Sequence, residues 1–479
     1  ADLAMATSRV RAPTVALTAS LTSGGAIAVA AGGLWRMLAL GGAALGLGAS
    51  LSSVVVAKRV LRAVLFVEVP VLLLLASSLV WRVRTTDDIA ADPLDAAGQI
   101  RVGCVGLAGL LALTALVWPS GIEAGVGRTP LPFRLYGAYV LVVFAGAPLS
   151  VQPLLTAYRG VELATAVLVL LAARQSVGIE AIPRIGATLF WFLVALVGSV
   201  WAGVLAFPSL AVQPLLNEAA PVPWNVQGVY PSIAPNGVGT LGVTLVIWSL
   251  ARARPGGGGR PLRPAVAYAL AAVGVVTLLA SQYRTGYGAL AIGVAVLLAL
   301  RNRRMLLVAI LLGTAIWMAF LGPQLVEQAA PFLLRGQTTE EARGLTSRVE
   351  WWEASIPVWE KSPLVGRGLL TGTRFEVLAR LGLRDTGGIH STWVEVLVGT
   401  GLIGLGLLLA SAAVSMRRAL TLALSPGGAV LPLLLLTVML VRSVTGNTFE
   451  SFQGLETVTF MWLALSLGDA GRAWREELP

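Results

Sequence analysis

The sequence predicts an all-α, polytopic integral membrane protein with about 12–14 transmembrane helices and one long outer loop. Of its 479 residues, 56% are hydrophobic and 12% are charged, and the mean hydropathy is +0.81. A soluble core cannot bury that much apolar surface. Apolar runs lie inside stretches close to the roughly 20 residues that cross a bilayer as helix, for example at residues 71–80, 164–173, 306–321 and 431–441. Unpaired backbone groups are costly in lipid, which favours helices over open strands.

The apolar stretches set the expected order of the spans. Two are expected near residues 14–34 and 37–57, a third ends near Val80, and a fourth ends near Trp118. Later spans are expected near residues 135–147, 161–173, 185–207, from 236 onward, on both sides of 281–284, before 322, from 393, and twice more before 472. We therefore expect three regions: helices 1–11 over residues 1–322, a long loop with amphipathic helices over 323–391, and C-terminal helices over 392–479. No cleavable signal peptide is expected, because the first apolar stretch lacks a compact core followed by a cleavage site.

Basic residues fall in short clusters between the apolar spans. The net charge is +11 and the sequence pI is about 10.7, but the clusters follow the positive-inside pattern and do not form one basic domain. They place both termini in the cytoplasm, and we expect no nucleic-acid partner. The glycine run at residues 256–259 is interpreted as a flexible linker, because no Lys-Ser/Thr pair follows it as in a phosphate-binding loop. Cys104 is the lone cysteine, which excludes an internal disulfide or a cysteine-rich metal site.

The long loop carries His390, the only histidine in the chain. A histidine has an unperturbed pKa of about 6.5, which makes it the natural base near neutral pH. Arg159 and Arg284 lie in tight outer hairpins, and Arg348 lies beside tryptophans in the long loop. An arginine at an outer membrane boundary is not explained by orientation rules, so an anionic partner is one explanation. The alternatives are snorkelling or a local ion pair, such as Arg348 with Glu350 or Arg442 with Glu450.

The residues around His390 resemble a family motif. His390-Ser391, nine residues, Gly401, two residues and Gly404 are similar to the signature of the bacterial O-antigen ligase family, which also contains O-antigen polymerases and O-linked oligosaccharyltransferases. Further similarities, over roughly residues 230–405, are Ser281-Gln-Tyr-Arg284-Thr-Gly286 (the S-x-x-R-G element with an inserted threonine), Pro235-Asn236, Ser347-Arg348, Trp351-Trp352, Pro363-Leu364 and Gly366-x-Gly368.

The resemblance implies a GT-C-like membrane glycosyltransferase at the outer, periplasmic face of the bacterial inner membrane. It implies an undecaprenyl-diphosphate-linked glycan as donor, a hydroxyl of lipid A-core or another glycan as acceptor, and membrane lipids as surroundings. His390 would be the general base, and Arg284, Arg348 and Arg159 would bind the diphosphate. Guanidinium groups can stabilise a leaving phosphate without a metal, so we expect neither a metal site nor a cofactor. A single displacement would invert the anomeric centre.

Other features have two interpretations. Trp351, Trp352, Trp359 and Trp393 either form an interfacial belt or stack on sugar rings. Glu395 either orients the imidazole of His390 or is an ordinary paired carboxylate. The glycines at residues 399, 401, 404 and 406 suit close helix packing.

Two other function classes make different demands on the sequence. A polyprenyl-phosphate-sugar transferase of a different kind would use an acidic outer loop, for which Asp87-Asp88 is the candidate. A lipid-glycan transporter would place charged residues inside the spans and show an internal repeat, whereas the motif charges gather at one face and no repeat is visible.

Overall fold

The structure is a computed structural model that describes residues 60–80, 85–92, 94–117, 129–214, 222–253, 261–300, 308, 310–311, 348–383, 388–451 and 454–469. The spans expected at residues 14–34 and 37–57 lie outside these ranges, as does nearly all of the span at 306–321. Every other expected span coincides with a helix. The all-α polytopic prediction is confirmed.

Six helical stretches in the described ranges are long and apolar enough to cross a membrane. They are Val60–Ser77 with α4 (Val69–Ser77), α6 (Ala96–Val117), α7 (Leu131–Gly146) with its extension to Leu149, Pro153–Ala206, α12 (Pro264–Ser281) and α17 (Thr392–Leu424). The Pro153–Ala206 stretch comprises α8 (Pro153–Val177) and α9 (Ala181–Ala206), joined by a short 3-10 turn. Shorter apolar helices are α13 (Arg284–Leu300), α18 (Leu431–Ser443) and α19 (Leu455–Ser466), and α11 (Pro235–Arg252) is as long as α12.

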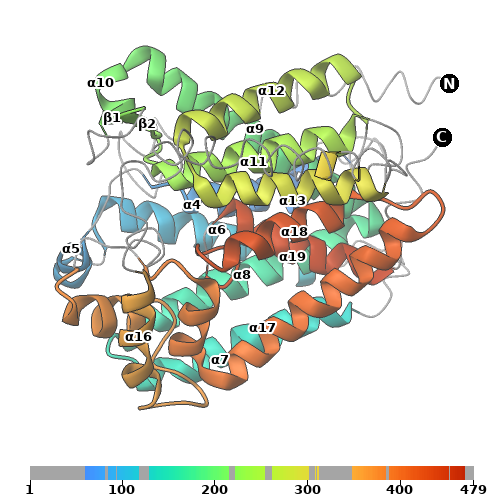
Figure 1. Cartoon of the computed structure of the whole chain (residues 1–479). Coiled ribbons are helices and arrows are strands. Elements are labelled where there is room, and N and C mark those ends of the chain that lie inside the picture. The colour runs from blue at the N-terminus through green and yellow to red at the C-terminus, as the bar shows by residue number, and fades with distance from the viewer. Residues whose placement is uncertain are drawn as a thin grey trace.

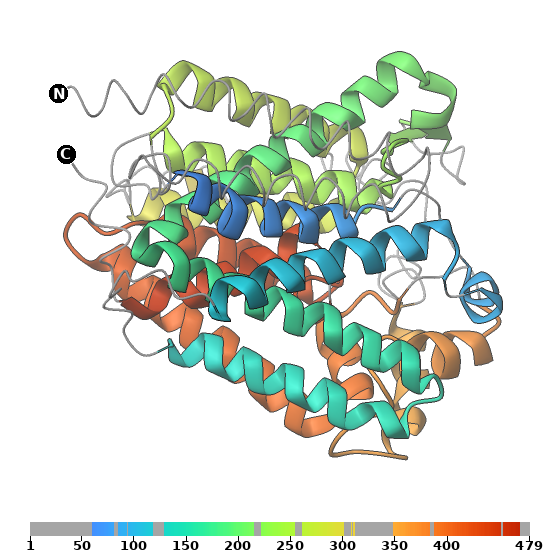
Figure 2. The ribbon, with the colours of Figure 1, turned by 180° about the vertical axis from the view of Figure 1, so that it is seen from behind.

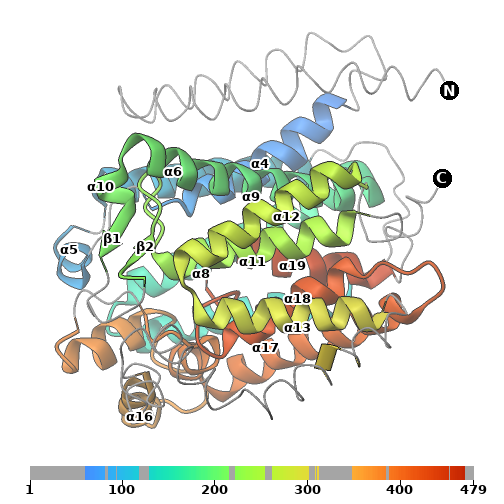
Figure 3. The same cartoon turned by 45° about the horizontal axis from the view of Figure 1, so that its top comes forward.

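The long helices run side by side as one bundle (Figure 1). The smaller elements α5 (Thr86–Ala91), α10 (Pro208–Ala211), the hairpin β1 (Val212–Pro214) with β2 (Trp224–Val226), and α16 (Arg348–Trp359) gather at one end of it (Figures 1 and 3). From behind, the blue to cyan helices α4, α6, α8 and α7 lie next to one another (Figure 2). We call the end that carries α5, the hairpin and α16 the site end.

Aromatic side chains fill the centre of the bundle. Trp248 of α11 stacks on Trp462 of α19 with ring centroids 5.8 Å apart, and both are buried. Tyr136 and Tyr139 of α7 are also buried, and their hydroxyls donate to the carbonyls of Phe449 (2.7 Å) and Glu450 (2.6 Å). A buried tyrosine hydroxyl needs such a partner. These two bonds fix the loop between α18 and α19, residues 445–451, which we call the 445–451 loop.

The helix α17 is broken at Gly401, whose φ of 63° is not helical. Residues 363–368, the inserted segment, pair with the backbone groups that the break leaves open. The amides of Leu402 and Ile403 donate to the carbonyls of Pro363 (2.8 Å) and Leu364 (3.1 Å), and the amides of Arg367 and Gly368 donate to Val398 (2.8 Å) and Gly399 (3.0 Å). A helix interruption is tolerated at membrane depth only when its freed groups are satisfied in this way.

The glycines of the motif therefore do more than allow close helix packing. A Cβ at Gly401 would collide with the backbone of Leu364 and Val365, and one at Gly366 would collide with Gly399 and Thr400. Both residues also have a positive φ, which L side chains rarely adopt. At Gly406, by contrast, an added Cβ would meet no neighbouring atom within 4 Å. Close helix packing therefore explains only part of the glycine pattern, because Gly401 marks a break in the helix.

Gly401→Ala tests this account of the break. Backbone strain alone costs about 1–3 kcal/mol, and the collision with the inserted segment adds to it, so we expect a clearly lower melting temperature in detergent. Gly406→Ala, on the same helix, is the matched control and is expected to melt like the wild type. Equal melting temperatures for the two variants would contradict the inserted-segment geometry.

Candidate active site

His390 is held in a strained backbone conformation just before α17. Its φ is 54°, in the left-handed region that is uncommon for residues other than glycine. The residues on either side are fixed: Trp352 Nε1 donates to the carbonyl of Ile389 (3.1 Å), and the amide of Thr392 donates to the carbonyl of Gly446 (3.1 Å). The indole ring of Trp351 lies 6.0 Å from the imidazole, centroid to centroid. Strain of this kind is typical of functional sites, where the surroundings over-determine one residue.

Arg348 begins α16 and faces the same region. Its Nη1 donates to the carbonyl of Thr445 at 3.0 Å. Arg348 is therefore anchored to the 445–451 loop. Its Nη1 atom does not pair with Glu350, which was the alternative interpretation of the sequence. Burial lowers the pKa of Arg348, and the charge of Arg284 lowers it further, while Tyr283 acts in the opposite sense. The two guanidinium groups are thus close enough to repel each other.

Arg284 is positioned by a tight turn between α12 and α13. α12 ends at Ser281, Gln282 adopts the left-handed conformation with φ 53°, and α13 begins at Arg284. The side-chain amide of Gln282 donates to the backbone carbonyls of Val222 (3.1 Å) and Trp224, which ties this turn to the β1–β2 hairpin. Next to Arg284, the hydroxyl of Thr285 lies 2.9 Å from that of Thr445. The threonine inserted in the S-x-x-R-G element therefore bonds to the 445–451 loop.

The imidazole of His390 is neutral at neutral pH. Burial is the main cause that lowers its pKa, and the charge of Arg348 lowers it further, to about 4. A neutral imidazole has a free lone pair and can accept a proton. Arg348 and Thr285, the residue after Arg284, both bond to Thr445, and the charge of Arg348 acts on His390. The structure therefore brings together three of the four predicted site residues.

Arg159, the fourth predicted residue, belongs to a different cluster. Its Nη1 donates to Glu162 at 2.7 Å, and Arg101 of α6 pairs with the same carboxylate. Glu162 is fully buried, so one acid is shared by two cations inside the helices. Within the described ranges, none of the contacts joins Arg159 to His390, Arg284 or Arg348. We therefore leave Arg159 out of the candidate site.

The other charged residues singled out in the sequence have structural partners. Arg442 pairs with Glu456, not with Glu450. Glu395 is fully buried and accepts from the amide of Leu370 (2.9 Å) and the hydroxyl of Thr373 (2.8 Å), so its contacts hold α17 against residues 370–373. Asp88 accepts from the amide of Thr85, the N-cap residue of α5, at 2.9 Å. In the ranges that the structure describes, no group of three or more His, Cys, Asp or Glu residues could hold a metal ion.

The 445–451 loop is the part of the site that sequence reasoning missed. It accepts from Arg348 through Thr445, and it binds the start of α17 through the hydroxyl of Thr392, which donates to Glu450 Oε2 (2.8 Å). Glu450 and Thr392 are both fully buried. The signal in the sequence is a polar run, Thr-Gly-Asn-Thr-Phe-Glu-Ser, between two apolar helices.

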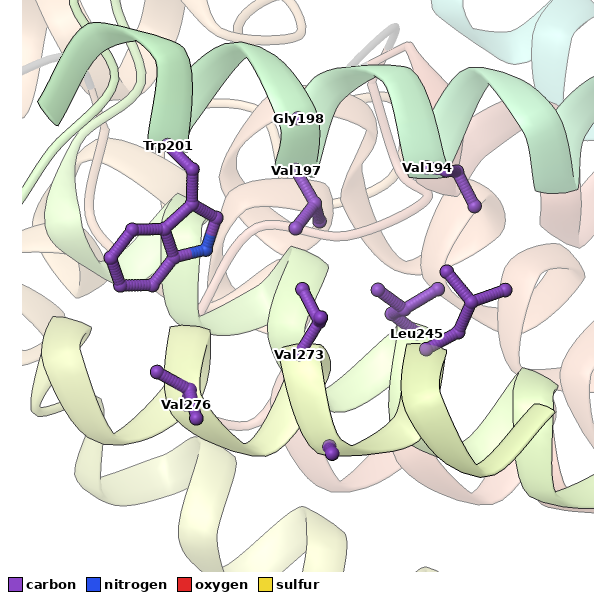
Figure 4. A pocket seen from close by; sticks show the side chains of 9 residues that line it. Val194, Val197, Gly198, Trp201, Leu245, Val273 and Val276 are labelled. Atoms are coloured by element: carbon purple, nitrogen blue, oxygen red, sulfur yellow. The ribbon is translucent and has the colours of Figure 1, made fainter. Parts of the chain in front are cut away.

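An apolar cleft of about 550 Å³ lies between α9, α11 and α12 (Figure 4). Its lining contains only apolar residues and one glycine, including Val194, Val197, Trp201, Val273 and Val276. It offers no cation to a phosphate, so we do not place the chemistry there.

Residues 269–409 match the family model described as O-antigen ligase. The match covers less than half of the 479 residues, so the similarity to the O-antigen ligase family is a similarity of this segment. The O-antigen ligase segment contains Arg284, Arg348 and His390, whereas Arg159 and the 445–451 loop lie outside it. No curated protein shows significant similarity to the chain. The family and the apolar helices together indicate a multi-pass membrane glycosyltransferase of the O-antigen ligase or polymerase type.

Because the chain has a single histidine, its titration can be followed by one set of imidazole NMR resonances. We expect a midpoint near pH 4 in the protein without substrate. In Arg348→Gln the midpoint should move upward, because a repelling cation is lost, yet stay below about 6.5 because burial remains. A wild-type midpoint near 6.5, unchanged in Arg348→Gln, would contradict the geometry.

Proposed function

We propose that the protein transfers a glycan from undecaprenyl diphosphate to a hydroxyl of lipid A-core, with Arg284 and Arg348 binding the diphosphate and His390 acting as general base. The observation that carries this proposal is the placement, at the site end, of a neutral imidazole near the guanidinium of Arg348, which in turn lies near that of Arg284. Bringing like charges together is unfavourable, and an anion bound between them removes the repulsion. A lipid-linked diphosphate is an anion that reaches such a site from the membrane.

The proposed reaction is a single displacement. The acceptor hydroxyl oxygen attacks the anomeric carbon of the donor sugar while His390 takes the hydroxyl proton. The bond between the anomeric carbon and the diphosphate oxygen breaks, and its electron pair leaves with the diphosphate. The products are the new glycoside with inverted configuration, undecaprenyl diphosphate and an imidazolium, which later returns its proton to solvent.

The two arginines serve the leaving group. Negative charge builds up on the bridging oxygen as the bond breaks, and guanidinium groups can donate two parallel hydrogen bonds to phosphate oxygens. Arg348 is already held by Thr445, so little reorganisation is needed when the donor binds. The bound diphosphate also offsets the positive potential at His390. Its pKa should then rise from about 4 toward the range where general-base catalysis is efficient.

Membrane orientation is part of the proposal. The basic clusters of the sequence favour cytoplasmic termini, which puts the site end and the loop at 323–391 on the periplasmic side of the inner membrane. Helices over residues 1–322 and 392–479 would then form the membrane domain on either side of that loop. The donor would enter from the bilayer, and the acceptor from the outer leaflet.

The same site could also serve a polymerase or an O-linked oligosaccharyltransferase, since these share the donor. Product size separates a ligase from a polymerase. One transfer to rough lipopolysaccharide indicates a ligase, and a ladder built on a second donor molecule indicates a polymerase. Transfer to a protein acceptor indicates an O-linked oligosaccharyltransferase. The lipid-glycan transporter is disfavoured, because Arg284, Arg348 and His390 lie at the starts of helices at the site end and not inside the long helices.

Substitutions should separate the roles of the arginines and the histidine. Lysine at Arg284 or Arg348 keeps the positive charge but cannot donate two parallel hydrogen bonds as a guanidinium does. Donor affinity should therefore fall about tenfold or more, together with turnover. His390→Ala should lower turnover by roughly 10²- to 10⁴-fold with near-normal donor affinity. His390→Gln should be equally impaired, because an amide cannot take the proton.

The control for these variants is Arg380→Lys, at a surface arginine whose side chain is 59% exposed and lies 4.0 Å from Glu376. It should match the wild type in donor binding and in rate. The measurements are initial rate and lipid-diphosphate affinity in variants whose membrane expression is confirmed. A His390→Gln variant with wild-type turnover would remove the general-base role, and one that cannot bind donor would move His390 into the phosphate site.

We also propose that transfer needs no divalent metal, because the two arginines supply the charge that a metal would provide. Chelation with EDTA should leave the initial rate unchanged. Loss of activity in EDTA, restored by magnesium or manganese, would instead favour the acidic-loop mechanism with Asp87 and Asp88.

A further inference from the structure

Asn447, in the middle of the 445–451 loop, has a side-chain oxygen with no hydrogen-bond partner. Its Oδ1 atom is shielded from solvent by the protein and receives no donor in the structure. Buried polar atoms nearly always have a hydrogen-bond partner. At an exception next to a candidate active site, the substrate can supply the missing hydrogen-bond donor. Asn447 lies outside the segment that matches the O-antigen ligase family.

The side chain lies against the backbone that carries His390. A Cβ built on Gly388, two residues before His390, would be 3.3 Å from Asn447 Nδ2 and 3.8 Å from Oδ1. Two residues earlier in the loop, Thr445 accepts from Arg348. The loop thus runs from the arginine side of the site to the histidine side, and Asn447 is on the histidine side.

The loop is held rigidly on both sides of Asn447. The carbonyl of Gly446 accepts from the amide of Thr392 (3.1 Å), and the amide of Thr448 donates to Glu450 Oε2 (2.9 Å). Because its neighbours are fixed, the Asn447 side chain is presented at a defined place relative to the start of α17. Rigid placement is what a substrate-binding group requires.

A carboxamide has the hydrogen-bonding capacity that sugar hydroxyls match. It donates through Nδ2 and accepts through Oδ1, and each hydroxyl can both donate and accept. Its oxygen is unsuited to a phosphate, which has no hydrogen to donate when ionised. The anion is therefore left to Arg284 and Arg348.

We propose that Asn447 binds a hydroxyl of the acceptor sugar and holds that sugar next to His390. This inference rests on the proposed transferase function. Asn447 would be an acceptor-binding residue, and the glycan donor would be bound without its help. The ligand class is a hydroxyl-rich sugar, either the core of a lipopolysaccharide or the terminal sugar of a second lipid-linked glycan.

The test is steady-state kinetics of the full chain with an undecaprenyl-diphosphate-linked oligosaccharide as donor. Rough lipopolysaccharide is supplied as one acceptor and excess donor as the other. Asn447→Ala should raise the KM for the acceptor that the wild type uses by about tenfold, the effect of one lost hydrogen bond, with donor affinity within about twofold. Asn225→Ala is the control, since its Oδ1 is also buried without a partner but lies on strand β2.

An acceptor KM that stays at the wild-type value in Asn447→Ala would overturn the proposal, as would an equal rise in Asn225→Ala. If Asn447→Ala does not fold, Asn447→Asp keeps the shape and loses the donor. Its carboxylate should raise the pKa of His390 in the single-histidine titration as well as the acceptor KM, and an unchanged pKa would contradict the placement.

Failure of the transferase function itself can be told apart from failure of this inference. Acceptor binding is measured without turnover in His390→Ala, with and without the additional Asn447→Ala change. If the wild type transfers glycan but Asn447→Ala does not weaken acceptor binding in that background, only this inference falls. If the wild type transfers to neither acceptor, the proposed function falls.

Discussion

The break in α17 is the constraint on which the geometry of the candidate site depends. A membrane helix that stops at Gly401 exposes amides and carbonyls that lipid cannot satisfy, and the inserted segment at residues 363–368 satisfies them. This pairing brings the segment after α16 against α17. His390 lies two residues before the first residue of this helix, while α16 begins with Arg348. The break therefore couples the two sides of the site through backbone hydrogen bonds.

The 445–451 loop provides the second coupling. Its Thr445 accepts a hydrogen bond from Arg348 and bonds to Thr285 in the turn at Arg284. Its Glu450 accepts from Thr392 at the start of α17. Two tyrosine hydroxyls from α7 also hold it in place. Residues that are far apart in the sequence thus share one rigid support. This explains how guanidinium groups that repel each other stay in place before a ligand arrives.

Much of this organisation can be predicted from the sequence, because the signals are local. Apolar length predicts the spans, and His390 stands out because it is the only histidine in the chain. The sequence predicts an outer-boundary position for Arg159 as it does for Arg284 and Arg348, but the partner of Arg159, Glu162, is one helical turn away and is shared with Arg101. The sequence shows only that the spacing of Gly401 suits helix packing. The positive φ that breaks the helix there is not visible in a sequence. The role of the 445–451 loop depends on contacts with residues more than fifty positions away, which no local pattern reports.

The proposed reaction is one displacement at the anomeric carbon, assisted by His390 as base and by Arg284 and Arg348 as cations. The direct test is the anomeric configuration of the product formed by the purified protein from undecaprenyl-diphosphate-linked oligosaccharide and rough lipopolysaccharide or a second donor, read by NMR couplings of the new linkage. The account predicts release of undecaprenyl diphosphate and an inverted linkage. A retained configuration would contradict it, because retention requires a covalent intermediate or a second displacement that His390, Arg284 and Arg348 do not supply.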